Sequence, residues 1–170
     1  MPDLILPHGG VTEIVIHSAA DRTAPMGTPI PVSDADLSTL YRIGDGGLSP
    51  LTGPMVKSEY DQVLEEEVIV RGGKKYAWTI PLAFPVSEEL AKKLKPGTEY
   101  QLHSQKNRYV GTIMVKDVYP WDKKKYNASV YGTPREDHPG AASPTAIHAP
   151  SLSAATYRCC RNRRTPSTAT

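Results

Sequence analysis

Residues 99–103, E-Y-Q-L-H, and residues 109–119, Y-V-G-T-I-M-V-K-D-V-Y, decide the fold class of this 170-residue chain. The second stretch is rich in β-branched and aromatic residues, the first alternates polar and apolar residues from Glu99 to Leu102, and the short stretch between them predicts a β-hairpin that turns over Ser104–Arg108. The second stretch carries apolar residues on both faces, with Val110 and Met114 on one and Ile113 and Val115 on the other. A strand that is apolar on both faces belongs in the middle of a sheet.

Three short helices are expected before this hairpin, each marked by a capping residue or a proline. Ser33 is followed by an acid three residues later, which makes a capping box. Pro54, after Gly53, suits the first position of a helix over 55–66, where apolar residues recur at helical spacing. Ser87 predicts the third helix, with two acids near its positive end.

Further strands are expected at 11–17, 68–70 and 76–84, with a turn over 71–74. Pro81 lacks a ladder donor, so the third of these should be an edge strand or bulged. The pattern lacks the long βαβ alternation of a doubly wound fold. It predicts the α+β class, a small β-dominated barrel with short helices. The expected core comprises the following residues: Trp78, Ile80, Leu82, Phe84, Leu90, Leu94, Leu102, Ile113 and Val115.

The composition changes at Gly140. Residues 1–140 hold sixteen Lys and Arg against eighteen acids, whereas residues 141–170 hold four Arg and no acid. The second segment is rich in Ala, Thr, Ser and Pro and has few large apolar residues, so it cannot offset its ordering entropy. We therefore expect a domain over 1–140 and a disordered basic tail over 141–170. The tail's composition suits frame-shifted reading of GC-rich DNA, which translation of the downstream DNA in the other frames would test.

Features of targeting and of disulfide scaffolds are missing from the sequence. No apolar run is long enough for a membrane helix, and the first residues lack the basic start of a secretory signal. The two cysteines, Cys159 and Cys160, are neighbours. A cytoplasmic location is the expectation.

Catalytic and metal-binding motifs are also missing. Gly72-Gly73-Lys74 is not a phosphate loop, and Gly44–Gly47 lacks the spacing of a dinucleotide fingerprint. None of the five histidines is paired at helical spacing. Zinc held by His138, His148, Cys159 and Cys160 is an alternative by residue type, but adjacent cysteines are not a C-x-x-C pair. We expect no metal and no cofactor.

Two basic runs leave a binding function open. Lys123–Lys125 lies between Trp121 and Tyr126, and Lys92, Lys93 and Lys95 follow the third helix. Basic residues interleaved with aromatic ones can bind nucleic acid. A solvated face is the favoured interpretation, because residues 1–140 are net acidic.

The order of several motifs resembles the ATP sulfurylase (sulfate adenylyltransferase) family. The resemblance covers about residues 4–140 and departs from the family at Leu48 and Pro54, where phenylalanine is common. The motifs are L-P-H-G-G at 6–10, G-L-S-P-L-T-G-P-M at 47–55, W-T-I-P-L at 78–82, P-V-S-E-E at 85–89, V-Y-G-T at 130–133 and D-H-P-G at 137–140.

This resemblance implies a PUA-like N-terminal domain, a β-barrel whose catalytic partner is the nucleotidyltransferase domain that follows it. In the family that second domain joins sulfate to ATP, giving adenosine 5′-phosphosulfate and pyrophosphate, through Q-x-R-N and H-x-G-H motifs. Neither motif occurs here; Gln105–Arg108 has the residues in the wrong order. No catalytic or substrate-binding residue is therefore expected, and the chain alone should be inactive.

Other functions stay open at this level. One alternative is a free-standing PUA-like module that binds RNA through its lysines, and another is a structural or regulatory domain. The expected partner is the nucleotidyltransferase domain, with ATP and sulfate as its substrates. Self-association through an exposed apolar patch is a further expectation.

Overall fold

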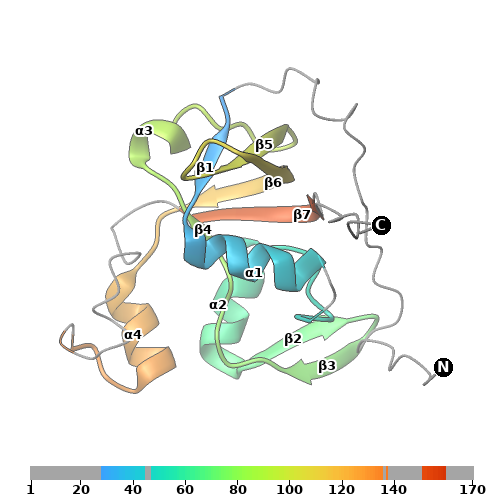
Figure 1. Ribbon diagram of the computed structural model, residues 1–170. Helices are drawn as coiled ribbons and strands as arrows, with labels where there is room; N and C mark the ends of the chain where they lie inside the picture. The colour runs from blue at the N-terminus through green and yellow to red at the C-terminus, as the bar shows by residue number, and fades with distance from the viewer. Residues whose placement is uncertain (1–27, 45–46, 136, 138–150, 160–170) are drawn as a thin grey trace, which may run out of the picture.

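The computed structural model describes residues 28–44, 47–135, 137 and 151–159 of the 170. Over these residues it has a five-stranded sheet, a separate two-stranded sheet and four helices (Figure 1). In chain order the elements are β1 (Ile30–Val32), α1 (Asp34–Gly44), α2 (Lys57–Glu66), β2 (Val68–Arg71), β3 (Lys74–Ala77), β4 (Phe84–Pro85), α3 (Glu88–Ala91), β5 (Glu99–Ser104), β6 (Tyr109–Tyr119), α4 (Lys123–Tyr131) and β7 (Ser151–Cys159). The α+β class is confirmed.

The larger sheet is built around β6, as the sequence predicts. Its strand order is β1-β5-β6-β7-β4. β5 and β6 form the expected antiparallel hairpin, with Tyr100 opposite Ile113, and β1 adds to β5 in parallel. Ile113 and Val115 on one face are both 0% exposed, and Val110 on the other face is 5% exposed, so the strand is buried on both faces, as its apolar pattern predicts.

β2 and β3 form a separate antiparallel hairpin below α1 in Figure 1. Gly72 and Gly73 at its turn have φ of 55° and 75°. Glycine adopts these left-handed conformations without steric cost, and two of them in succession match a two-residue hairpin turn. The turn predicted over 71–74 is confirmed.

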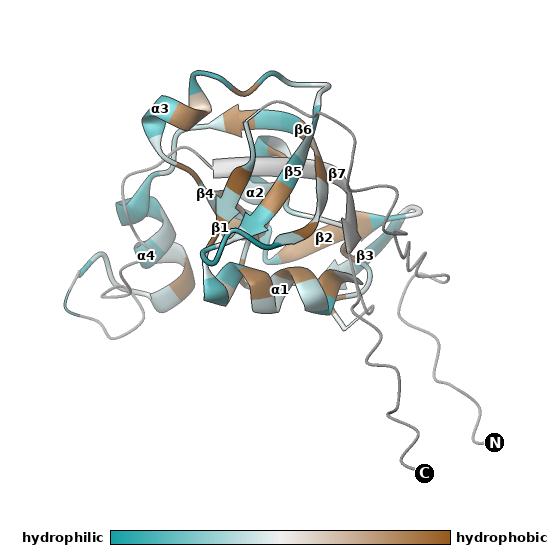
Figure 2. Ribbon diagram, turned by 45° about the horizontal axis from the view of Figure 1, so that its top comes forward, coloured by the Kyte–Doolittle hydropathy of each residue, from teal (hydrophilic) through white to brown (hydrophobic). Residues whose placement is uncertain are grey.

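The capping predictions are correct for α1 and α3. Asp36 N–H donates to the Ser33 hydroxyl oxygen at 3.1 Å, and Leu90 N–H donates to the Ser87 hydroxyl oxygen at 3.3 Å. Burial raises the pKa of Asp36 above its usual value. α1 turns Leu40, which is fully buried, toward the sheet, and hydrophobic and hydrophilic residues alternate along the helix (Figure 2).

The start of α2 differs from the prediction. Its N-cap is Val56, not Gly53, and Pro54 does not occupy the first helical position. Pro54 and Met55 are buried, and Met55 N–H donates to the Leu82 carbonyl at 2.7 Å. This pairing holds the chain against 78–82 before the helix can begin.

α4 was not expected from the sequence. Asp122 is its N-cap, accepting a hydrogen bond from Lys125 N–H at 3.0 Å, and Gly132 ends it with φ of 67°. Its signal was present: an Asp at the cap and a glycine after the last turn.

Two clusters of buried side chains form the core. The first lies between the large sheet, α1 and α3, and the second lies between α2, the small sheet and the end of β6. The first contains Ile30, Val32, Leu40, Ile43, Phe84, Val86, Leu94, Tyr100, Leu102, Val110, Ile113 and Val115. The second contains Leu51, Met55, Tyr60, Val63, Ile69 and Tyr119.

The predicted strand over 76–84 is wrong. β3 ends at Ala77, and β4 covers only Phe84–Pro85. Ile80, expected in the core, is 55% exposed, while Trp78, Leu82 and Leu90 are only partly buried. The β2–β3 ladder already ends at Ala77, and Pro81, which has no N–H, cannot take part in a ladder as a donor further along.

β7 is the second difference. Ser151–Cys159 falls in the segment expected to be disordered, yet it pairs with β6 and β4. Backbone pairing with a central strand does not require a large apolar side chain at every position, and this explains why composition missed it. The rest of 141–170, and the strand expected at 11–17, lie outside the described residues.

Candidate functional site

Two of the motifs that carry the family resemblance, at 47–55 and 78–82, meet at Met55, inside the second core cluster. Met55 is fully buried, and its carbonyl accepts a hydrogen bond from the Tyr119 hydroxyl at 3.0 Å. Its N–H and its sulfur both bond to the backbone of Leu82, in the W-T-I-P-L motif. These two motifs therefore contribute to the packing of the core.

A groove of about 470 Å³ opens beside this cluster, between α2 and the start of α4. Apolar surface from Leu64, Pro120 and Trp121 lines it, together with the side chain of Tyr60. Charged residues of both signs make up the remaining lining: Lys57, Asp61, Asp122, Lys123, Lys124 and Lys125.

Aromatic side chains join α4 to α2 under the groove. The Trp121 indole Nε1–H donates to the Tyr60 hydroxyl at 2.7 Å, and the rings of Trp121 and Tyr126 lie 5.6 Å apart. Tyr60 in turn packs on Tyr119 at 5.6 Å. Burial raises the pKa of Tyr60, Tyr119 and Tyr126 above the usual tyrosine value, so all three hydroxyls are neutral at physiological pH.

Acids of α2 neutralise part of the basic run on α4. Lys125 Nζ lies 3.0 Å from Glu65 and 3.6 Å from Asp61, and its hydrogen bond to Glu65 raises its pKa. Asp61 is also paired with Lys57. A nucleic-acid site needs cations available to phosphates, and here one cation of the run, Lys125, is shared with carboxylates. These ion pairs suit a solvated, charged surface whose contacts help to hold α4 against α2, in line with the solvated-face interpretation.

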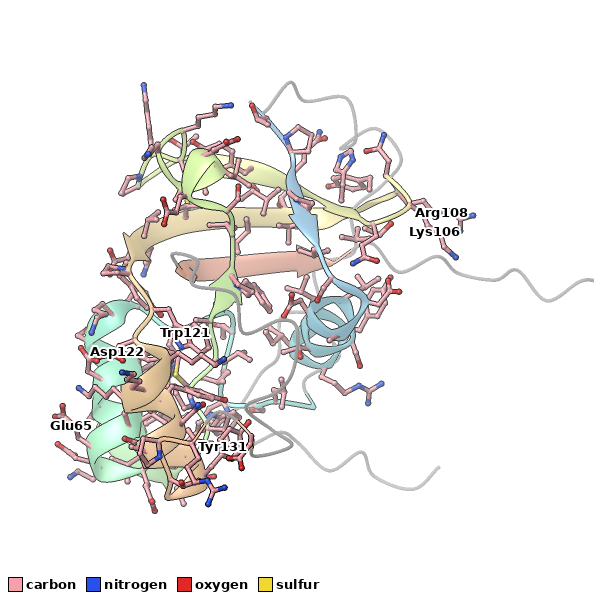
Figure 3. The ribbon with its side chains drawn as sticks, turned by 90° about the vertical axis from the view of Figure 1, so that its left-hand side faces the viewer. Glu65, Lys106, Arg108, Trp121, Asp122 and Tyr131 are labelled. Atoms are coloured by element: carbon pink, nitrogen blue, oxygen red, sulfur yellow. The ribbon has the colours of Figure 1, made fainter. Side chains whose placement is uncertain are left out.

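The other candidates lie elsewhere and apart from one another. Lys106 and Arg108 are exposed at the tip of the β5–β6 hairpin, far from Glu65, Trp121 and Tyr131 (Figure 3). His103, near the same tip, has its ring nitrogens 2.9 Å from Asn107 Oδ1 and 3.1 Å from Gln101 Oε1. Lys92, Lys93 and Lys95 follow α3 and are exposed. These residues do not converge on one site.

Metal ligation finds no support in the part of the chain that the structure describes. No group of three or more His, Cys, Asp or Glu side chains there could hold an ion. His8, His17, His138, His148 and Cys160 lie outside that part, and for Cys159 only the backbone is described. Within the same residues no helix is long and apolar enough to cross a membrane.

Known proteins resemble this chain along most of its length. Sulfate adenylyltransferase from Pyropia yezoensis is 47% identical over 135 residues, which cover 79% of this chain and 32% of that protein. The enzyme of the same name from Synechococcus sp. (strain JA-3-3Ab) is 35% identical over 143 residues, 81% of this chain and 36% of the relative. The chain thus spans about a third of the length of these relatives.

A solved structure has the same fold. The hexameric APS kinase from Thiobacillus denitrificans superposes with a TM-score of 0.63 over 97% of this chain and 28% of that one, at 17% identity. The family model described as a PUA-like domain matches residues 5–150. The chain therefore belongs to the PUA-like domain family, in the form that sulfate adenylyltransferases carry at their N-terminus.

Proposed function

We propose that this chain is the non-catalytic N-terminal part of a sulfate adenylyltransferase. Its role is to support a nucleotidyltransferase domain, which joins ATP and sulfate into adenosine 5′-phosphosulfate and pyrophosphate. The observation that carries this is the 47% identity to the Pyropia yezoensis enzyme over 135 residues, limited to 32% of that protein.

The arrangement of the family motifs supports a structural role. Two of them, at 47–55 and 78–82, pack together at Met55, which is buried. Transfer to the α-phosphorus of ATP needs positioned charges that stabilise the developing negative charge. The Q-x-R-N and H-x-G-H motifs that supply them in the family are absent from this sequence.

A chimera tests the proposal. Residues 1–140 of this chain replace the matching third of the Pyropia yezoensis enzyme, and pyrophosphate release is measured with ATP and sulfate. We expect the chimera to retain activity and the isolated chain to have none. A matched chimera carrying Met55→Ala should lose activity on warming before the parent chimera does.

Two results would contradict the proposal. A folded chimera that binds neither substrate and turns nothing over would show that this domain cannot replace its counterpart. Sulfate-dependent turnover by the isolated chain, persisting through extensive purification, would show that it carries catalytic residues of its own.

Self-association belongs to the same proposal. The described part of the domain exposes Ile80 at 55%, Tyr41 at 40% and Val70 at 38%, which offers apolar surface for contact between copies of the isolated chain. We expect a concentration-dependent mass for the isolated chain in sedimentation equilibrium. The chimera should keep the oligomeric state of the parent enzyme.

A further inference from the structure

The position of β7 is at odds with its place in the sequence. The family match ends at residue 150, and β7 begins at Ser151. Nevertheless β7 lies inside the five-stranded sheet, with β6 on one side and β4 on the other (Figure 1). The segment that completes the sheet is therefore not part of the matched family sequence.

The edge of β6 that β7 covers needs a partner strand. β6 runs over eleven residues, and Thr112, Ile113 and Val115 are at most 3% exposed. Buried backbone N–H and C=O groups must be paired, because water cannot reach them. β5 pairs with one edge of β6, from Tyr109 to Met114, and β7 pairs with the other, from Gly111 to Tyr119.

β4, on the other side of β7, also depends on β7 for its backbone pairing. Among the described strands β4 pairs only with β7, with Phe84 opposite Leu152 and Pro85 opposite Ser151. Phe84 is 3% exposed and belongs to the first core cluster, so β4 is held by packing as well as by β7. The two strands that flank β7 thus belong to the family-matched part and are fixed by its core.

We propose that β6 and β4 form a strand-accepting slot, and that an extended segment enters it through backbone hydrogen bonds with little dependence on side chains. Strand addition of this kind takes its affinity from the main chain. The sequence of β7, S-L-S-A-A-T-Y-R-C, offers four Ser or Ala among nine residues. In this chain β7 is the occupant.

The connection between α4 and β7 keeps β7 close to the strands that it pairs with. α4 ends at Tyr131, and the nineteen residues 132–150 can reach about 60 Å when extended. The tether keeps β7 at a high effective concentration beside the slot, so modest affinity suffices. In a longer chain, the polypeptide after the match is the segment that the same tether would present, which would couple this domain to the one that follows.

A proline scan of β7 in the full chain tests the slot. Beyond the two residues that pair with β4, each amide of β7 faces either β6 or away from it. The two orientations alternate within a regular stretch, and the register shifts on both sides of Val115. Proline is placed at each position from Ser153 to Arg158 in turn. It should remove hydrogen-exchange protection from β6 amides where the replaced amide faces β6, and leave that protection where the amide faces away. The proposal would be overturned if the β6 amides stayed protected from exchange in every proline variant. It would also be overturned if these amides were unprotected in the parent chain.

A second variant separates backbone recognition from side-chain recognition. Residues 152–158 are shuffled without adding proline, and β6 should keep its protection. A synthetic peptide of residues 150–160, added to the most disruptive proline variant, should restore the protection of the β6 amides. The same peptide N-methylated on the amides that face β6 should not restore it. Loss of protection on shuffling would show that β7 is read by its side chains. None of these readouts involves sulfate activation, so their failure leaves the proposed function standing.

Discussion

Met55 and Leu82 bond to each other through both of their backbone amides. Met55 N–H donates to the Leu82 carbonyl at 2.7 Å, and Leu82 N–H donates to the Met55 sulfur at 3.4 Å. The two residues lie in different motifs of the family, and Tyr119 at the end of β6 closes the junction by donating to the Met55 carbonyl. The second core cluster is organised around this contact.

Replacing Met55 by alanine should therefore destabilise the domain strongly. Met55→Ala removes a fully buried side chain and the sulfur acceptor, so the free energy of unfolding should fall by about 2–5 kcal/mol. Ile80→Ala is the matched control, because Ile80 is 55% exposed, and it should change stability by less than about 0.5 kcal/mol. Urea unfolding followed by tryptophan fluorescence measures both. Equal losses in the two variants would contradict the assignment of the core.

The hairpin was predictable because its signal is local. β5 and β6 carry period-two patterns joined by a short turn, and burial on both faces of β6 is visible as apolar residues on both faces. The caps of α1 and α3 were equally local, since Ser33 and Ser87 bond to amides three residues away.

The errors come from tertiary contacts. Ile80 has the spacing of a core residue, but the strand ends before it, at Ala77. The Trp78 indole donates to the Ile80 carbonyl at 2.8 Å, and the Ile80 side chain is 55% exposed. β7 was missed because its pairing partner, β6, lies more than thirty residues earlier in the sequence. The groove between α2 and α4 depends on the contact between Trp121 and Tyr60, and no periodic pattern in the sequence predicts that contact.

The hydrogen bond between Trp121 and Tyr60 should couple α4 to α2. Trp121→Phe and Tyr60→Phe each leave a partly or fully buried polar group without its partner, at a cost of about 1–3 kcal/mol. Together they should cost less than the sum of the two, because the second change removes the orphaned group. A double-mutant cycle in urea measures the coupling. Additive losses would mean that the two side chains contribute only packing.

Stability should decline in alkaline solution. Burial raises the pKa of Tyr60, Tyr119 and Tyr126 in the folded state, while an unfolded tyrosine ionises near pH 10. The unfolded state therefore releases protons first, and the free energy of unfolding should be flat with respect to these groups below about pH 9. Above about pH 10 it should fall, by up to about 1.4 kcal/mol per pH unit for each group. Urea midpoints from pH 8 to 11 test this, and Tyr60→Phe should reduce the slope.

Glu67 offers a stabilising substitution. It ends α2 with φ of 55° and ψ of 33°, a left-handed conformation that disfavours residues with a Cβ, and its side chain is exposed. Its role at the cap is carried by the backbone, since its N–H donates to the Val63 carbonyl at 3.0 Å. Glu67→Gly should therefore raise the free energy of unfolding by up to about 1 kcal/mol. Gly132→Ala makes the reverse change at the end of α4, where φ is 67°, and should lower it by about 1 kcal/mol. Thermal unfolding followed by circular dichroism compares the two, and shifts of the same sign would mean that backbone conformation does not govern these helix ends.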